Sequence, residues 1–250
     1  MDDVAILVMD EADRLLEMGF EAEIKELVKS CPRERQTLLF SATLTDKVED
    51  LAAVSLRSPV RLSADGASAT PDVSFLSQEF VKIRDGSPDD TNEQKEAVLL
   101  ALCSRTYTKR TIIFAGTKQT AHRLKILFGL VGLKASELHG NLTQAQRLSA
   151  LEDFRVGVET DFLIATDVAA RGLDITGVEG VINFDAPRTI EGYSHRVGRT
   201  ARAGKKGRAI TLATELERPL LKKIAKTLTS RSLPTRSLPT TTINQYKDKI

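Results

Sequence analysis

The stretch TIIFAGTKQTAHRLKILFGLVGLKASEL, residues 111–138, determines the fold class of this chain. It begins with an apolar run over Thr111–Ala115 and ends with another over Ala135–Leu138. Between the two runs, apolar residues recur with helical spacing at Ala121, Leu124, Leu127 and Val131. Gly132 stands where such a helix would end. A strand, a helix and a second strand in this order predict a βαβ unit.

The same alternation extends over most of the chain. Further short apolar runs cover Val4–Met9, Thr37–Phe40, Phe162–Ala165, Val181–Phe184 and Ala209–Ala213. Several lack polar alternation, as expected of parallel strands that are covered on both faces. A second helical pattern begins after Thr143, a residue type that favours the N-cap position. We therefore predict an α/β fold built on doubly wound parallel sheets.

Composition shifts divide the chain into segments. Residues 63–74, SADGASATPDVS, are rich in small residues with Gly and Pro, so we predict a linker there between segments 1–62 and 75–228. The stretch RDGSPDDTNEQ, residues 84–94, indicates a loop inside the second segment. The tail, 229–250, contains RSLPT twice in succession, and we predict that it is flexible.

Bulk composition excludes several classes of protein. Hydrophobic residues make up 41% of the 250 and charged residues 28%, as in ordinary soluble globular domains. The net charge of +2 does not by itself indicate a nucleic-acid partner, so any basic surface must be local. Cys31 and Cys103 lack metal-ligand spacing, and no apolar run reaches the ~18 residues of a membrane span. Asp2 and Asp3 are unlike the basic start of a signal peptide, so we expect a cytosolic or nuclear protein.

Acidic and hydroxyl side chains follow the first two predicted strands. Asp10, Glu11 and Asp13 come directly after Val4–Met9. A carboxylate at a strand end can hold Mg²⁺ through water beside a nucleotide triphosphate, and an adjacent Glu can orient the attacking water. Alternatively, acidic residues merely favour a helix start. Ser41 and Thr43 follow the second strand and could bond these carboxylates or cap the next helix.

The second segment carries its own polar strand ends. Each of these positions suits a phosphate or ribose contact, although each could equally belong to an ordinary βα loop. The candidates are Thr117, Gly140, Gln144, Arg147, Thr166, Asp167 and Gly172.

A run of arginines completes the pattern in HRVGRTARAG, residues 195–204. Arg196, Arg199 and Arg202 recur every three residues, so a helix would place them along one side. Guanidinium groups match phosphate oxygens, whereas charge runs usually face solvent. No acidic residue occurs between His195 and Glu215, which favours phosphate contact.

Taken together and in this order, the DEAD, SAT, HG-then-QxxR, ATDVAARGLD and HRVGRTARAG segments resemble the DEAD-box family of ATP-dependent RNA helicases. The resemblance covers residues 1 to about 228. It implies RecA-like lobes, with 1–62 as the C-terminal part of a first, ATP-binding lobe and 75–228 as a complete second helicase lobe. The stretches LKILFGL and ELHGNLTQAQRL are most similar to the nucleolar branch that acts in large ribosomal subunit assembly.

The resemblance also implies roles by position. Asp10 would hold Mg²⁺ through water, and Glu11 would handle the catalytic water. Arg199 and Arg202 would reach the ATP γ-phosphate, while Gly172 and Asp174 would contact the nucleotide. Asp13 would bind the Ser41–Thr43 segment near the nucleotide, and Ser41, Thr43 and His195 would form the interdomain interface. The residues that would lie along the RNA backbone are Thr117, Gly140, Gln144, Arg147, Thr166 and Asp167.

The resemblance implies a mechanism and a setting as well. ATP and RNA would both favour closure of two lobes, so that their binding is coupled. The implied partners are RNA, in particular a ribosomal RNA precursor, and pre-ribosomal proteins, with no membrane. The implied setting is a monomer in the nucleus and nucleolus.

One family element has no counterpart in these residues. A phosphate-binding loop of the form GxxxxGK[ST] occurs nowhere in the chain, so we expect the opening residues to be the middle of a domain. Two hypotheses remain open. The chain is a fragment of an ATP-dependent RNA helicase, inactive in isolation, or it is a truncated RNA-binding or regulatory module. A chromatin translocase is a third class, which the DEAD and HRVGRTAR spellings disfavour.

Overall fold

The computed structural model describes residues 3–63, 75–84, 86–170, 175–202, 204–228 and 233–250. The chain divides into two compact units, Met1–Ala69 and Thr70–Ile250, and each is described by itself. No helix among the described residues is long and apolar enough to cross a membrane. Cys31 and Cys103 are both buried, and neither forms a disulfide within the described residues.

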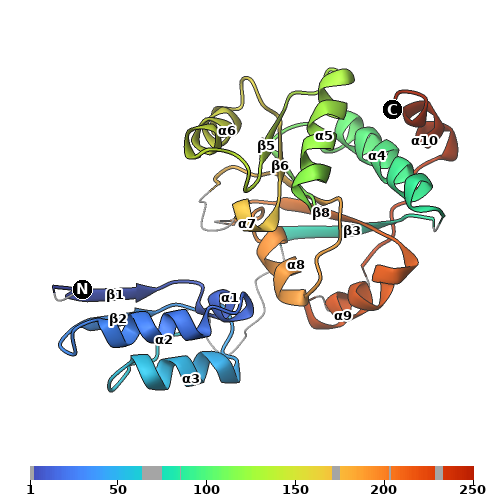
Figure 1. Cartoon of the computed structure of the whole chain (residues 1–250). Helices are drawn as coiled ribbons and strands as arrows, with labels where there is room; N and C mark the ends of the chain where they lie inside the picture. Colours follow the sequence, from blue (N-terminus) through green and yellow to red (C-terminus); the bar gives the residue numbers. More distant parts are fainter. Residues whose placement is uncertain (1–2, 64–74, 85, 171–174, 203, 229–232) are drawn as a thin grey trace. The chain divides into compact units, whose positions relative to one another are not determined.

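The first unit is a two-stranded parallel sheet packed against three helices (Figure 1). Strand β1 (Ile6–Met9) pairs with β2 (Gln36–Leu39), and the helices are α1 (Ala12–Glu17), α2 (Glu21–Ser30) and α3 (Asp46–Ser55). Its core comprises Met9, Ala12, Leu16, Ile24, Val28, Val48 and Leu51. Ile6 and Val8 alternate with Met9 along β1 and remain 58% and 53% exposed. This strand therefore leaves apolar side chains uncovered within the unit, unlike the buried parallel strands of the second unit.

The second unit is a six-stranded parallel sheet. Its strands are β3 (Leu76–Lys82), β4 (Thr111–Phe114), β5 (Ala135–Leu138), β6 (Phe162–Ala165), β7 (Gly180–Asn183) and β8 (Gly207–Ala213), in the spatial order β3-β8-β7-β4-β6-β5. Every pairing between them is parallel. The apolar runs predicted from residue 111 onward correspond to β4 to β8 within a few residues of their expected bounds.

Helices cover both faces of this sheet (Figure 1). They are α4 (Pro88–Arg105), α5 (Lys118–Leu130), α6 (Gln144–Val156), α7 (Asp167–Ala170), α8 (Ile190–Val197) and α9 (Arg218–Leu228), with a 3₁₀ turn at Glu215–Glu217. One core contains Leu99 of α4 and Phe128 of α5, whereas the other contains Phe154 of α6 and Tyr193 of α8. Two hydrophobic layers on opposite faces of a parallel sheet confirm the predicted doubly wound α/β class.

Helix boundaries follow local chemistry. The Thr143 hydroxyl accepts a hydrogen bond from Gln146 N–H, and the Gln146 side chain accepts one from Thr143 N–H, which is a capping box at the start of α6. At the end of α5, Gly132 has φ +75°, and Leu133 N–H donates to Phe128 O at 2.8 Å. This left-handed residue closes the helix as the sequence predicted.

Two elements of the second unit differ from the sequence-based expectation. The stretch 84–94 is not all loop, because α4 begins at Pro88 with Ser87 as its N-cap. Proline suits the first helical turn, since its missing N–H would have no partner there. Strand β3 follows the predicted linker and was not anticipated. It mixes polar and apolar residues, as is usual for a strand at the edge of a sheet.

The end of the chain, from residue 233 onward, is not the flexible tail that we predicted. Phe80 N–H donates to Pro234 O at 3.1 Å, and Arg236 N–H donates to Phe80 O at 2.8 Å, so the segment extends the edge of β3. Helix α10 (Thr240–Lys247) then lies beside α4 (Figure 1). Its Ile243 and Tyr246 pack against the core that α4 shares. Helix α4 is buried on two sides for this reason, which explains its weak amphipathic pattern.

Candidate functional site

In the first unit, the predicted acidic and hydroxyl residues meet at the carboxyl ends of β1 and β2. Asp13 Oδ2 accepts hydrogen bonds from Thr43 Oγ1 at 2.8 Å and from Thr43 N–H at 3.0 Å. Ser41 Oγ donates to Thr43 O at 2.7 Å. Neither hydroxyl caps α3, because Thr45 does so by accepting from Val48 N–H. The contact expected between these two strand ends is therefore present.

Glu11 adopts a conformation that is unusual for a residue with a side chain. Its φ of 49° and ψ of 47° lie in the left-handed region, which costs free energy for any residue except glycine. It occupies the N-cap position of α1, yet its side chain makes no capping hydrogen bond. Asp10 Oδ1 accepts the Glu11 N–H at 2.9 Å. Helix capping therefore does not explain Glu11, and strained backbone of this kind is frequent at functional sites.

In the second unit, the predicted RNA residues gather at the carboxyl ends of the strands, here called the candidate RNA edge. Thr117 follows β4, Gly140 follows β5 and Thr166 follows β6, and these three strands are neighbours in the order β4-β6-β5. Because parallel strands end at the same edge, loops that are 20 to 50 residues apart in sequence converge here. A Cβ built on Gly140 would meet no atom within 4 Å, so the space above this loop is open.

Side chains at this edge have structural contacts of their own. Thr117 caps α5 by accepting from Thr120 N–H at 3.0 Å. Gln144, the first residue of α6, is exposed, and Arg147 one turn later donates to Ala169 O at 3.3 Å. That bond connects the first turn of α6 to α7.

Arg196 does not have the position expected from its spacing. It is 3% exposed, and its guanidinium donates to both carboxylate oxygens of Asp167 at 2.6 and 2.8 Å. It also donates to Asn183 Oδ1 at 3.2 Å and to Asp185 O at 2.6 Å, and lies 5.1 Å from the Phe114 ring centroid. Arg196 is thus a buried anchor between strand ends, and Asp167 is its partner.

Arg199 and Arg202 do not share a helix with Arg196. Helix α8 ends at Val197, and the chain turns at its C-cap, Gly198. Arg202 Nε donates to Gly198 O at 2.7 Å within that turn. Both arginines therefore lie on the turn after α8, and half-buried His195 lies in its last turn. The predicted nucleotide contacts Gly172 and Asp174 lie outside the described residues.

Two charged residues at this edge were missed by the sequence reasoning. Asp185 follows β7 and accepts the Gly116 N–H at 2.8 Å through Oδ2. Lys95, from α4, donates to Asp185 Oδ1 at 3.3 Å. An available signal was the polar Asn183 and Asp185 in and after a strand that is otherwise apolar. Lys95 had no local signal, because its partner lies 90 residues later in the sequence.

A second charged group surrounds Glu137 on β5. His122 Nδ1 lies 3.0 Å and His139 Nε2 3.3 Å from Glu137 Oε2, and Lys125 Nζ lies 3.7 Å from Oε1. Burial raises the pKa of the Glu137 carboxyl, but the hydrogen bond with His122 and the charge of Lys125 outweigh it and hold that pKa below its ordinary value. Within the described residues, no group of three acidic, His or Cys side chains is arranged to hold a metal ion.

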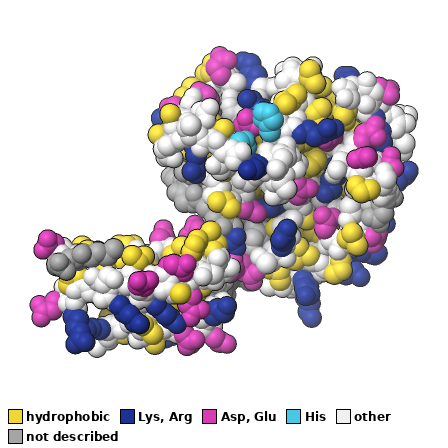
Figure 2. All heavy atoms as spheres, in the orientation of Figure 1, with side chains coloured by type: hydrophobic (Ala, Val, Ile, Leu, Met, Phe, Trp, Pro, Cys, Tyr) yellow, Lys and Arg dark blue, Asp and Glu magenta, His cyan; other side chains and the backbone are white. Residues whose placement is uncertain are grey.

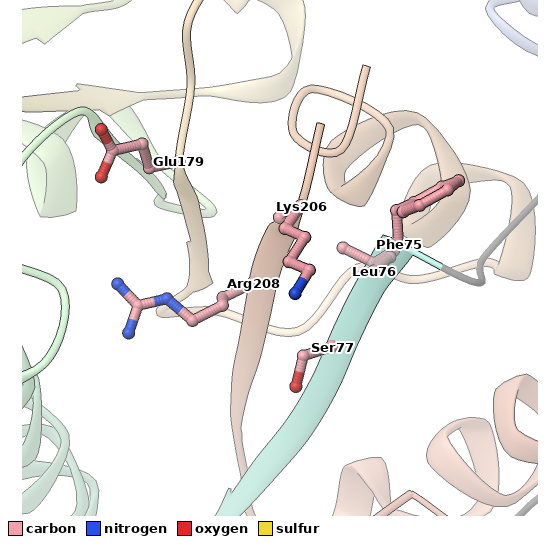
Figure 3. A pocket seen from close by; sticks show the side chains of 7 residues that line it. Phe75, Leu76, Ser77, Glu179, Lys206 and Arg208 are labelled. Atoms are coloured by element: carbon pink, nitrogen blue, oxygen red, sulfur yellow. The ribbon is translucent and has the colours of Figure 1, made fainter. Parts of the chain in front are cut away.

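A hollow of about 540 Å³ opens at the amino ends of the strands, opposite the candidate RNA edge. Figure 3 shows its lining, with Lys206 and Ser77 at the amino ends of β8 and β3 and Arg208 directed away from Phe75. The predicted RNA residues follow the carboxyl ends of strands, so this hollow is separate from them. Arg199 and Arg202 instead lie in the connection between α8 and β8, which leads into the strand that lines the hollow.

Two family models match this chain, one in each of its two units. Residues 1–51 match the description DEAD/DEAH box helicase, and residues 94–204 match Helicase conserved C-terminal domain. The DEAD-box ATP-dependent RNA helicase 28 of Arabidopsis thaliana is 60% identical over 232 residues, which are 92% of this chain and 28% of the relative. The chain belongs to the DEAD-box family of RNA helicases. The resemblance read from the motifs is thus confirmed.

Two further relatives define the likeness within this family. ATP-dependent RNA helicase drs1 of Schizosaccharomyces pombe is 50% identical, over 93% of this chain and 30% of the relative. The structure of Dbp5 from S. cerevisiae bound to RNA and ADP BeF3 matches with a TM-score of 0.81 at 29% identity, over 99% of this chain and 63% of that chain. The fold is RecA-like, as expected, and the chain spans less than a third of the length of the first two relatives.

Proposed function

We propose that this chain carries the RNA-binding lobe and part of the ATP-binding lobe of an ATP-dependent RNA helicase that acts in ribosomal RNA processing and large-subunit assembly, in the nucleolus. The observation that carries the proposal is the convergence of Thr117, Gly140 and Thr166 at the carboxyl ends of three adjacent strands. The names of the drs1 relatives support the helicase activity. The assembly role and location rest on the branch resemblance.

RNA binding at this edge would use the sugar-phosphate backbone. Two helices, α5 and α6, begin there, and their N–H groups and dipoles favour anions. Arg147 adds a cation at the start of α6, held in place by its bond to Ala169 O. Such contacts read phosphate and sugar rather than base identity, so we expect recognition that is largely independent of sequence.

The first unit would supply the groups that act on ATP. Asp10 is exposed, and its carboxylate provides the hard oxygen donor that a water-coordinated Mg²⁺ requires. Such an ion would neutralise phosphate charge. Glu11, held in strained backbone after Asp10, would orient the attacking water, and the Asp13–Thr43 bonds would fix α1 against the second strand end. Arg199 and Arg202 would approach the γ-phosphate from the second lobe.

The alternative is an RNA-binding or regulatory module without ATP hydrolysis, which the lack of a GxxxxGK[ST] loop in these 250 residues supports. An ATPase assay on the 250-residue chain tests hydrolysis directly: without such a loop we expect no RNA-stimulated turnover from this chain alone. RNA-stimulated turnover that Glu11→Gln abolishes would establish hydrolysis by this chain alone. Turnover that Glu11→Gln leaves unchanged would come from a contaminant.

RNA binding is tested by fluorescence anisotropy with a labelled single-stranded homopolymer RNA over a series of salt concentrations. Arg147→Ala should weaken binding and reduce the slope of log K against log salt by about 0.7, the contribution of one phosphate contact to single strands. Arg147→Lys should keep the slope. The matched control is Arg155→Ala on the same helix, where Arg155 pairs with exposed Glu152. Equal behaviour of Arg147→Ala and Arg155→Ala would refute the proposed surface.

A further inference from the structure

We propose that Lys95 and Asp185 form a positioning pair for RNA. The Asp185 carboxylate fixes the Gly116–Thr117 loop by accepting the Gly116 N–H, and Lys95 neutralises that carboxylate so that it does not repel the RNA backbone. This inference rests on the proposed function, because it names further residues that act at the same edge. Neither residue belongs to the motifs that suggested the site.

Asp185 connects two strand ends that are neighbours in the sheet. It follows β7, which pairs with β4, and its Oδ2 accepts the Gly116 N–H just after β4 at 2.8 Å. A Cβ on Gly116 would lie 3.2 Å from that same oxygen, so the close approach favours glycine. Asp185 O accepts a second bond, from Arg196 Nη1 at 2.6 Å. The loop that ends in Thr117 is therefore fixed through Asp185.

Lys95 is an unusual residue for its place in the fold. It is 6% exposed on α4, with its Nζ 3.3 Å from Asp185 Oδ1, 3.9 Å from Glu217 Oε1 and 5.7 Å from the Phe184 ring centroid. A buried ammonium group is costly to desolvate, and a well-packed apolar side chain usually serves stability as well or better. Stability alone therefore does not account for a lysine here.

The requirement for charge follows from where Asp185 lies. Its side chain is 30% exposed at the edge where the RNA phosphates would bind. A carboxylate beside a phosphate path opposes binding unless a cation compensates it. Lys95 reaches the carboxylate from the protein interior, so it compensates the charge without occupying the RNA surface. The pair thereby provides a rigid acceptor for Gly116 with little net negative charge.

The test is a double-mutant cycle with Lys95→Met and Asp185→Asn, measured by RNA anisotropy on the full chain. Lys95→Met should weaken binding about 3- to 10-fold at low salt, with a smaller effect at high salt. Asp185→Asn retains an oxygen that accepts the Gly116 N–H, so it should preserve or strengthen RNA binding even though it lowers stability. The double variant should bind within about twofold of wild type, because neither unpaired charge remains.

Two further measurements separate this inference from a merely structural role and from the proposed function. Arg236→Met breaks a comparable ion pair to Glu79, 2.7 Å long, and should lower the melting temperature without changing RNA affinity. Hydrogen exchange of the Gly116 amide, which needs no RNA, should be faster in Lys95→Met. Unchanged RNA affinity of Lys95→Met, or weakened binding by Asp185→Asn, would overturn the pair. Failure of wild type to bind RNA would overturn the proposed function instead, and unchanged Gly116 exchange would then remove the positioning role too.

Discussion

Replacing Arg196 by Met tests whether this arginine is an anchor or a phosphate ligand. In the structure its guanidinium contacts four groups: the Asp167 carboxylate, Asn183 Oδ1, Asp185 O and the Phe114 ring. Met is similar in length and apolar, so it fills most of the space and removes mainly the charge and the donors.

The magnitude follows from what each partner loses. Asn183 is fully buried, so its Oδ1 without a donor should cost about 1–3 kcal/mol, and the partly buried Asp185 O somewhat less. Loss of the cation–π contact with Phe114 adds about 1–2 kcal/mol at a desolvated site. Asp167 is 39% exposed and regains water, so its contribution is discounted. We expect the free energy of unfolding to fall by about 3–5 kcal/mol, the usual effect of breaking a buried pair.

The assay exploits the distribution of tyrosines. The chain has no Trp, and its three Tyr residues, at 107, 193 and 246, all belong to the second unit. Tyrosine emission during urea denaturation therefore reports the unfolding of that unit alone. Arg155→Met is the control, since it removes an exposed arginine and should leave the midpoint unchanged. A loss below about 1 kcal/mol for Arg196→Met would contradict the anchor role and restore Arg196 as a phosphate ligand.

Three further outcomes are expected. Limited proteolysis should cleave within 1–62 before 75–228, because the first unit leaves strand β1 side chains uncovered; equal resistance would refute this. Deleting 233–250 should cost about 3 kcal/mol by exposing half-buried apolar residues, lowering the melting temperature by roughly 6–12 °C; an unchanged value would mean that α10 does not pack stably. Burial raises the pKa of Tyr107 from 10.0 to about 12, so the folded state keeps the phenol proton up to a higher pH than the unfolded state does. The free energy of unfolding should therefore decrease between about pH 10 and pH 12. Circular-dichroism unfolding should show this decline in wild type and a weaker one in Tyr107→Phe, whereas equal declines would exclude Tyr107.

The sequence predicted the elements whose signal is local. Buried parallel strands appear as short apolar runs, and the cap at Thr143 and the left-handed Gly132 are determined by neighbouring residues. Strand β3 was missed because an edge strand mixes polar and apolar residues. Helix α10 was missed because its stabilisation comes from α4, some 140 residues earlier, and not from its own composition.

The site shows the same division. That Asp13 would meet Thr43 could be inferred because both follow strand ends. The different roles of Arg196 and its two successors could not, because three-residue spacing predicts one helix face and does not reveal that the helix ends at Val197. Asp185 and Lys95 lie 90 residues apart, and only the folded sheet brings them together.

The acidic residues at the candidate RNA edge explain why net charge was a poor guide. Asp167 is paired with Arg196, Asp185 with Lys95, and Glu137 with His122 and Lys125. In the first two pairs the cation is almost fully buried, so it cancels the carboxylate from inside the protein. These carboxylates can therefore fix the loops through hydrogen bonds without presenting uncompensated negative charge to a phosphate backbone. The proposed RNA binding at this edge is compatible with a net charge of +2, because it would depend on the local field there and not on the total charge.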